Sequence, residues 1–89
     1  MSLVFPNRSR SFQSGKNRVR FWGYDSVLDI AFFVEAEALM KICPGSGWDE
    51  SKLLDVFDNA LDEIRRVADK VYKHRRERSY VYVLAAKDF

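Results

Sequence analysis

The residue types that carry most enzyme chemistry are few and scattered in this sequence, which has one cysteine, Cys43, and one histidine, His74. A nucleophilic cysteine needs a base or a positive field to form its thiolate, and the basic residue nearest to Cys43 in sequence is Lys41. Cations on both sides of His74 disfavour its charged form, and no second histidine or acid at i±4 completes a metal site. The sequence therefore predicts Cys43 as a small buried side chain and His74 as a solvated residue at a helix end.

The Gly-Ser-Gly loop at 45–47 is a weak form of a phosphate-binding loop. It precedes an expected helix N-terminus, where free N–H groups and the helix dipole favour anions. However, the loop follows a helix rather than a strand, and no Gly-Lys-Ser/Thr completes the motif. In addition, Asp49 and Glu50 would repel a phosphate. We therefore expect a plain turn between two helices.

Three carboxylates, Asp55, Asp58 and Asp62, recur on one exposed face of an expected long helix. Paired carboxylates can bind Mg²⁺ or act as acid and base. Here Asp62 stands four residues before Arg66, and the same spacing recurs at 69 and 73, which is typical of a solvated helix surface with ion pairs. We predict no catalytic, metal-binding or cofactor-binding residue, and we expect that the protein is not an enzyme.

Basic residues gather in two blocks. Residues 1–24 contain five Lys or Arg and no acid, and residues 65–78 contain seven against two acids, although the net charge of the chain is only +2. Basic side chains bind phosphates and aromatic rings stack on bases, so these blocks are what a nucleic-acid-binding protein would use. The alternative is that they only keep the domain soluble, and no recognised nucleic-acid-binding motif is present. The candidate contacts for nucleic acid or another anion are Arg8, Arg10, Arg18, Arg20, Lys73, Arg75 and Arg76.

A protein partner is the preferred interpretation. Trp, Tyr and Arg dominate interface energetics, and a core as small as this one is often stabilised by a partner. The expected interaction surface consists of Trp22, Tyr24, Tyr80 and Tyr82. We expect a non-catalytic binding or regulatory module that contacts another protein or itself as a homodimer, with a nucleic-acid-binding regulator as the alternative.

The hydrophobic pattern predicts one α+β domain over residues 1–89. The expected elements, in order, are an extended arm and loop (1–17), a β-hairpin (18–34), a short helix (35–43), a long helix (49–76) and a terminal strand (79–86). The chain order is β-β-β-α-α-β, because residues 3–5 form a further short strand. This order predicts an antiparallel sheet of about four strands with both helices packed on one face.

Strict alternation assigns the two faces of this sheet. Along the first hairpin strand Val19 and Phe21 share one face, and Arg18, Arg20, Trp22 and Tyr24 share the other. The strand over 27–34 is apolar on both faces, interrupted only by Asp29, so we expect it at the centre of the sheet.

Composition indicates a reduced, cytoplasmic protein. A single cysteine excludes an internal disulfide. The basic N-terminal residues are not followed by the apolar stretch of a secretory signal. The longest apolar run, 30–34, is far shorter than the roughly twenty residues of a membrane span. We expect neither a membrane nor a small-molecule substrate as a partner, and no cofactor.

Several segments together resemble one small bacterial family. They are residues 3–7 (LVFPN), 19–25 (VRFWGYD), 32–34 (FFV) leading to Ala38 and Leu39, the helix positions Leu54, Phe57, Ile64, Ala68 and Tyr72, and the closing Asp88 and Phe89. The family they resemble is named domain of unknown function 1488, and the resemblance covers nearly the whole chain. It implies a compact α+β protein of this size and brings no activity, cofactor or catalytic residue.

Overall fold

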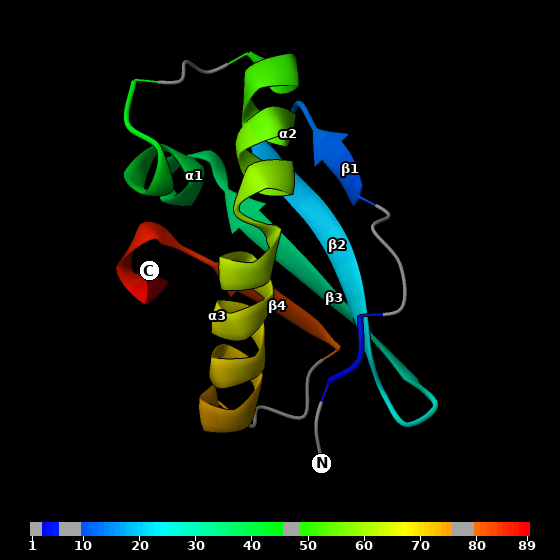
Figure 1. Ribbon diagram of the computed structural model, residues 1–89. Coiled ribbons are helices and arrows are strands. Elements are labelled where there is room, and N and C mark those ends of the chain that lie inside the picture. The colour runs from blue at the N-terminus through cyan, green and yellow to red at the C-terminus, as the bar shows by residue number, and fades with distance from the viewer. Residues whose placement is uncertain (1–2, 6–9, 46–48, 76–79) are drawn as a thin grey trace.

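The computed structural model describes residues 3–5, 10–45, 49–75 and 80–89 (Figure 1). Within these ranges the strands are β1 (Arg10–Gln13), β2 (Arg18–Asp25), β3 (Leu28–Glu35) and β4 (Val81–Leu84). The helices are α1 (Ala36–Ile42), α2 (Glu50–Asn59) and α3 (Leu61–Arg75), and a short 3-10 turn, η1 (Ala86–Asp88), follows β4. The expected α+β class is confirmed.

The four strands form one mixed sheet in the order β1-β2-β3-β4, with the apolar β3 between two neighbours as expected. β1 pairs with β2, and β2 with β3, in antiparallel fashion, but β4 is parallel to β3. The prediction of a purely antiparallel sheet is therefore wrong at its last strand. The reason is the path of the chain from β3 to β4. α1 is short and lies at one end of the sheet, and α2 and α3 then carry the chain back across one face to the start of β4 (Figure 1). A single helical crossover of this kind joins parallel strands.

The long helix expected at 49–76 is divided into α2 and α3 at Ala60, which has φ −106° and ψ 19°. Backbone hydrogen bonds continue around the break, from Ala60 N to Val56 O (3.0 Å) and from Ile64 N to Ala60 O (2.9 Å). The two helices run nearly end to end over the same face of the sheet (Figure 1). A bend here lets one apolar stripe follow the twist of the sheet. No helix in the described ranges has the length and hydropathy needed to cross a membrane.

The N-terminal region contains a strand where a polar loop was expected. β1 pairs with the start of β2, and farther along β2 Val4 and Tyr24 exchange two backbone hydrogen bonds of 2.8 Å. The strand was missed because its sequence, RSFQ, has a single apolar residue, Phe12, which is half-buried. Pairing with β2, rather than hydrophobic alternation, therefore defines β1.

The core between the sheet and the helices is built around aromatic rings. Phe21 lies 5.3 Å, centroid to centroid, from both Phe32 of the next strand and Phe57 of α2. Phe32 also stacks on Tyr82 at 5.8 Å. Ile64, in the middle of the apolar stripe, is fully buried. The apolar residues along 49–76 recur at steps of three or four, which predicts one buried stripe. This stripe packs on the face of β2 that carries Val19 and Phe21; its residues are Leu53, Phe57, Ala60, Ile64, Val67 and Val71.

Candidate functional site

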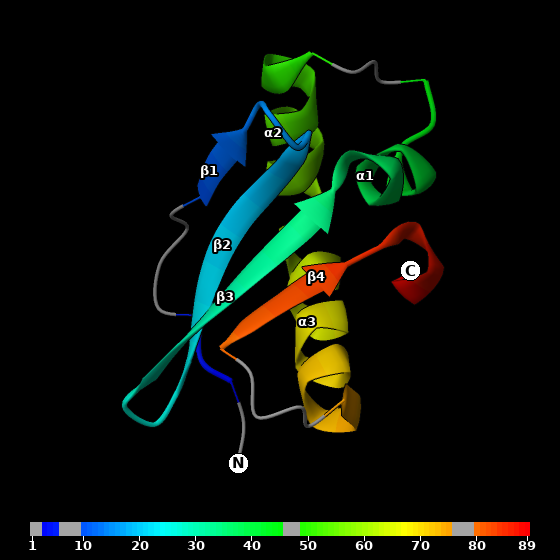
Figure 2. The same ribbon diagram turned by 180° about the vertical axis from the view of Figure 1, so that it is seen from behind.

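The side of the sheet away from α2 and α3 carries a distinctive group of side chains. Figure 2 shows the four strands in front of these two helices, with no described helix in front of the sheet. Burial alternates along β2, as the sequence predicts. Side chains of this outer side, which we call the open face, are Arg18, Arg20, Trp22 and Tyr24 of β2, Asp29, Ala31, Phe33 and Glu35 of β3, and Val81 and Val83 of β4.

Arginine side chains are stacked on rings across the open face. The Cζ of Arg18 lies 3.9 Å from the centroid of the Phe33 ring, and its Nε donates a hydrogen bond of 2.8 Å to Oε1 of Gln13. The Cζ of Arg20 lies 4.8 Å from the Trp22 ring and 5.8 Å from the Phe33 ring. Although no described helix covers Phe33, it is only 7% exposed, so its neighbours on the same face shield it. These contacts place both guanidinium groups against aromatic rings.

Charge is distributed unevenly along the open face. Arg18 is directly across from Glu35, and Tyr24 is directly across from Asp29 at the other end of the hairpin. Arg20 has no such acid, because its cross-strand neighbour is Phe33. Its Nε is buried and makes no hydrogen bond within the described part of the chain. The face therefore has a cation, Arg20, towards one end and an exposed carboxylate, Asp29, towards the other.

The four aromatic residues predicted as an interaction surface do not lie together. Trp22 and Tyr24 are partly exposed on the open face. Tyr82 is only 3% exposed and stacks on Phe32, so its assignment to the surface is wrong; alternation in β4 turns it towards the helices. Tyr80 is 57% exposed, but it stands two residues before Tyr82 and thus on the helix side of the sheet.

The predicted basic contacts are likewise divided between surfaces. Arg10 donates from Nε and Nη2 to the two carboxylate oxygens of Asp58 on α2, at 2.8 and 2.9 Å. This bond raises the pKa of Arg10 above its ordinary value and places the side chain on the helix side of β1. Arg18 and Arg20 lie on the open face instead. The two parts of the N-terminal basic block that the structure describes therefore lie on opposite sides of the sheet.

The second basic block belongs to the end of α3. Lys73 forms an ion pair of 3.0 Å with Asp69, as the spacing predicts. Arg8, Arg76 and the side chain of Arg75 lie outside the described residues. Because α3 covers the opposite side of the sheet from the open face, Lys73 is separated from Arg18 and Arg20 by the sheet (Figure 2).

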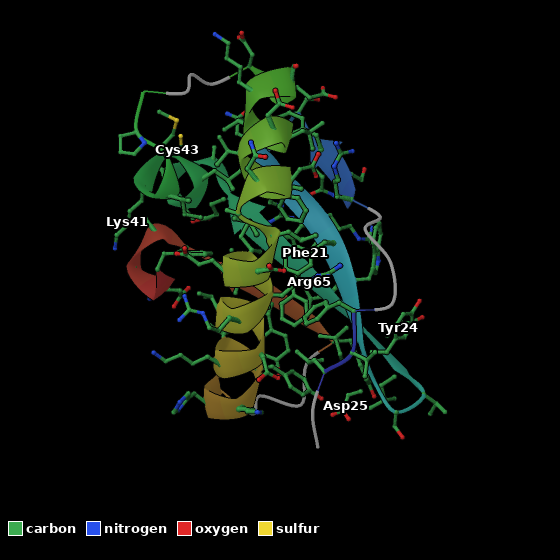
Figure 3. The ribbon with its side chains drawn as sticks, in the orientation of Figure 1. Phe21, Tyr24, Asp25, Lys41, Cys43 and Arg65 are labelled. Carbon is green, nitrogen blue, oxygen red and sulfur yellow. The ribbon has the colours of Figure 1, made fainter. Side chains whose placement is uncertain are left out.

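Cys43 is exposed, so the prediction of a buried thiol is wrong. It follows the last residue of α1, whose buried residues Ala38 and Leu39 come earlier in the helix. With Lys52 and Asp55 of α2, Cys43 lines an open hollow of about 390 Å³. Figure 3 shows Cys43 far from Tyr24 and Asp25. The predicted loop at 46–47 lies outside the described residues.

The remaining candidate ligands for a metal are dispersed. His74 is exposed on α3, in agreement with its prediction. Of the three carboxylates on the helix surface, Asp58 is bound by Arg10. Among the described residues, no three side chains of His, Cys, Asp or Glu gather in a way that would hold a metal ion.

A polar pair in the core was not foreseen. Asp25 is only 4% exposed, and its Oδ2 accepts a hydrogen bond of 2.5 Å from the hydroxyl of Tyr72 on α3. This hydrogen bond is the main cause that raises the pKa of Tyr72 to about 12. The Tyr72 ring also packs edge-on against Tyr82 at 5.5 Å. The pair links the end of β2 to α3. Alternation along β2 puts Asp25 on the same side as Phe21, so the sequence pattern could have predicted that Asp25 faces the helices.

Comparison with known proteins assigns the chain to a family without adding a function. Neither the curated proteins nor the solved structures contain a match. The family described as "Protein of unknown function (DUF1488)" matches residues 3–84, a span that includes all the strands and α-helices described above. The chain therefore belongs to the DUF1488 family of proteins of unknown function.

Proposed function

We propose that this chain is a non-catalytic binding module that contacts a protein partner through the open face. The observation that carries the proposal is the position of Trp22 and Tyr24, beside two ring-stacked arginines, on a side of the sheet that no described helix covers. Trp, Tyr and Arg are the residues that contribute most of the binding energy at protein interfaces. Trp22 is the one tryptophan among the described residues, so no other described surface combines all three.

The contacts that the arginines make within the chain support this role. Arg18 is held both by the ring of Phe33 and by the side chain of Gln13, so it loses little rotamer freedom when a partner binds. Ordering a free, rotamer-rich side chain at an interface costs about 0.5–1.5 kcal/mol. A surface whose long side chains are already ordered avoids much of this cost.

The division of the basic residues favours a protein over a nucleic acid as the partner. A phosphate backbone is bound by cations gathered on one surface. Here Arg10 is occupied by Asp58 on the helix side, and the open face carries two acids, Asp29 and Glu35, beside its two arginines. A mixed-charge face with aromatic side chains is better suited to another protein surface.

Site-specific photocrosslinking in the cells that produce the protein tests the proposal. A benzophenone-bearing phenylalanine analogue replaces Tyr24 in one variant and Tyr80, an exposed tyrosine away from the open face, in the matched control. We expect irradiation to give a discrete covalent adduct with an identified protein from position 24 and a much weaker one from position 80. Equal yields at both positions, or an adduct that nuclease removes, would contradict the proposal.

A further inference from the structure

We propose that the partner of the open face is a second copy of this chain. The two sheets would face each other about a two-fold axis that lies between them and crosses the strands at Trp22. This inference rests on the proposed function, since it names the occupant of the same surface. It follows from the way the charged and apolar residues of the open face are arranged about its centre.

Arg20 and Asp29 lie at equal distances along the strands on either side of Trp22. In the pairing of β2 with β3, Arg20 is opposite Phe33, Trp22 is opposite Ala31, and Tyr24 is opposite Asp29. Each of these pairs is two residues from the next, or about 6.7 Å along the strand. Arg20 therefore stands one step above the Trp22 pair, and Asp29 stands one step below it.

A two-fold axis across the strands exchanges these two positions between copies. The rotation reverses the strand direction and leaves the order of the strands across the sheet unchanged. Arg20 of one copy then lies over the Tyr24 and Asp29 pair of the other, and the reverse contact forms at the same time. Packed sheets are about 10 Å apart, a separation that an arginine and a carboxylate approaching from the two sheets bridge together. Arg20 is the arginine of the open face without a carboxylate directly across from it in its own sheet.

The centre of the open face supplies the apolar part of the contact. On the axis, Trp22 meets its own copy, and Ala31, which is 8% exposed, lies beside it in the same row across the strands. In the same row Val81, paired with Ala31, is 50% exposed and becomes covered. An apolar centre with polar and charged groups at the rim is the usual anatomy of a protein interface.

Charge reversal tests both the occupant and the axis. The variants Arg20→Glu and Asp29→Arg each place two like-charged pairs in the symmetric dimer, whereas a mixture of the two variants restores both attractive pairs. The control Lys70→Glu reverses an exposed charge on α3, away from the open face. Sedimentation equilibrium of each protein and of the equimolar mixture, at concentrations up to several hundred micromolar, measures the dimer dissociation constant. Asp29 is exposed, so its variant is expected to keep the native circular dichroism spectrum.

We expect a dimer for the natural sequence and for Lys70→Glu. Because opposed like charges weaken an interface strongly, the dissociation constant should rise about tenfold or more in each open-face variant. The mixture should associate about as well as the natural protein. A monomer at every concentration, or a mixture that stays monomeric while the natural protein dimerises, would overturn the inference. If the protein is a monomer and Tyr24 crosslinks to a different protein, the second copy is excluded and the proposed function stands.

Discussion

Gly23 of β2 lies against the ring of Phe5, and a Cβ built on Gly23 would approach Cε1 of Phe5 to 2.8 Å. The Phe5 ring lies 6.0 Å from that of Phe21 and 6.2 Å from that of Phe32, and Arg65 of α3 covers it with its Cζ 5.4 Å from the centroid. The missing side chain at Gly23 therefore makes room for an N-terminal residue to complete the aromatic core. Figure 3 shows Phe21 and Arg65 in this region, between the sheet and the helices.

We predict that Gly23→Ala lowers the free energy of unfolding by about 1–3 kcal/mol, because overpacking forces the ring of Phe5 to move. Gly15→Ala is the matched control: a Cβ there has no heavy atom within 4 Å, and a change within about 0.5 kcal/mol is expected. Urea denaturation of both variants gives the comparison. Equal losses at the two positions would show that Phe5 does not pack against Gly23.

A second prediction concerns the ion pair between Arg10 of β1 and Asp58 of α2. The pair is bidentate but partly exposed, with side-chain exposures of 33% and 44%. We expect a coupling free energy of up to about 1 kcal/mol from a double-mutant cycle with Arg10→Ala and Asp58→Ala. Salt should weaken it, because screening reduces the attraction between exposed charges. If Asp58→Ala leaves the free energy of unfolding unchanged at low salt, with Arg10 present, the ion pair between Arg10 and Asp58 is contradicted.

A third prediction uses the hydrogen bond from Tyr72 to Asp25. The pKa of Tyr72 is raised from an ordinary value of 10.0 to about 12, so the folded state holds this proton more tightly than the unfolded state does. The stability that this contributes is fully present below pH 10 and is lost as the pH rises from about 10 to 12. The free energy of unfolding should therefore fall over this range in the natural protein, and less steeply in Tyr72→Phe.

At neutral pH the same variant, Tyr72→Phe, should cost about 1–3 kcal/mol, because it takes a hydrogen bond from a carboxylate that is only 4% exposed. Tyr80→Phe, which removes a hydroxyl from a side chain that is 57% exposed, is the control and should have little effect. Denaturant melts at several pH values measure both effects. If the two variants have the same pH profile, the bond to Asp25 does not set the titration of Tyr72.

Much of the layout could be predicted from local patterns in the sequence. Alternation along β2 assigned Phe21 to the core and Trp22 to the opposite side, and the helical spacing placed Ile64 at a fully buried position. These features depend only on the period of each element and on the burial of apolar side chains. The position of β3 in the sheet followed in the same way, because both of its faces are apolar.

What could not be predicted depends on contacts between distant segments. The sequence RSFQ has no strand pattern, and β1 exists because β2 offers it a partner. Arg10 and Asp58 are forty-eight residues apart, so local patterns in the sequence cannot predict the ion pair between them. Tyr82 was misassigned because the face of β4 depends on its register with β3, which the sequence of four residues does not fix.

The last prediction separates the two partner classes by their dependence on salt and on Arg18 and Arg20. If the open face bound nucleic acid, release of counterions would drive the binding, and the affinity would fall steeply with salt. The double variant Arg18→Ala/Arg20→Ala would then weaken binding to single-stranded RNA and DNA about equally across sequences, because phosphate contacts do not depend on the base sequence.

We expect no such loss, since Glu35 and Asp29 share the face with these arginines and Arg10 is bound to Asp58 on the other side of the sheet. A gel-shift titration at about 50 mM salt, where the electrostatic contribution is large, is the measurement. Tight binding by the natural protein that disappears in the double variant would make nucleic acid the better-supported partner and would move the function from a protein interface to phosphate recognition.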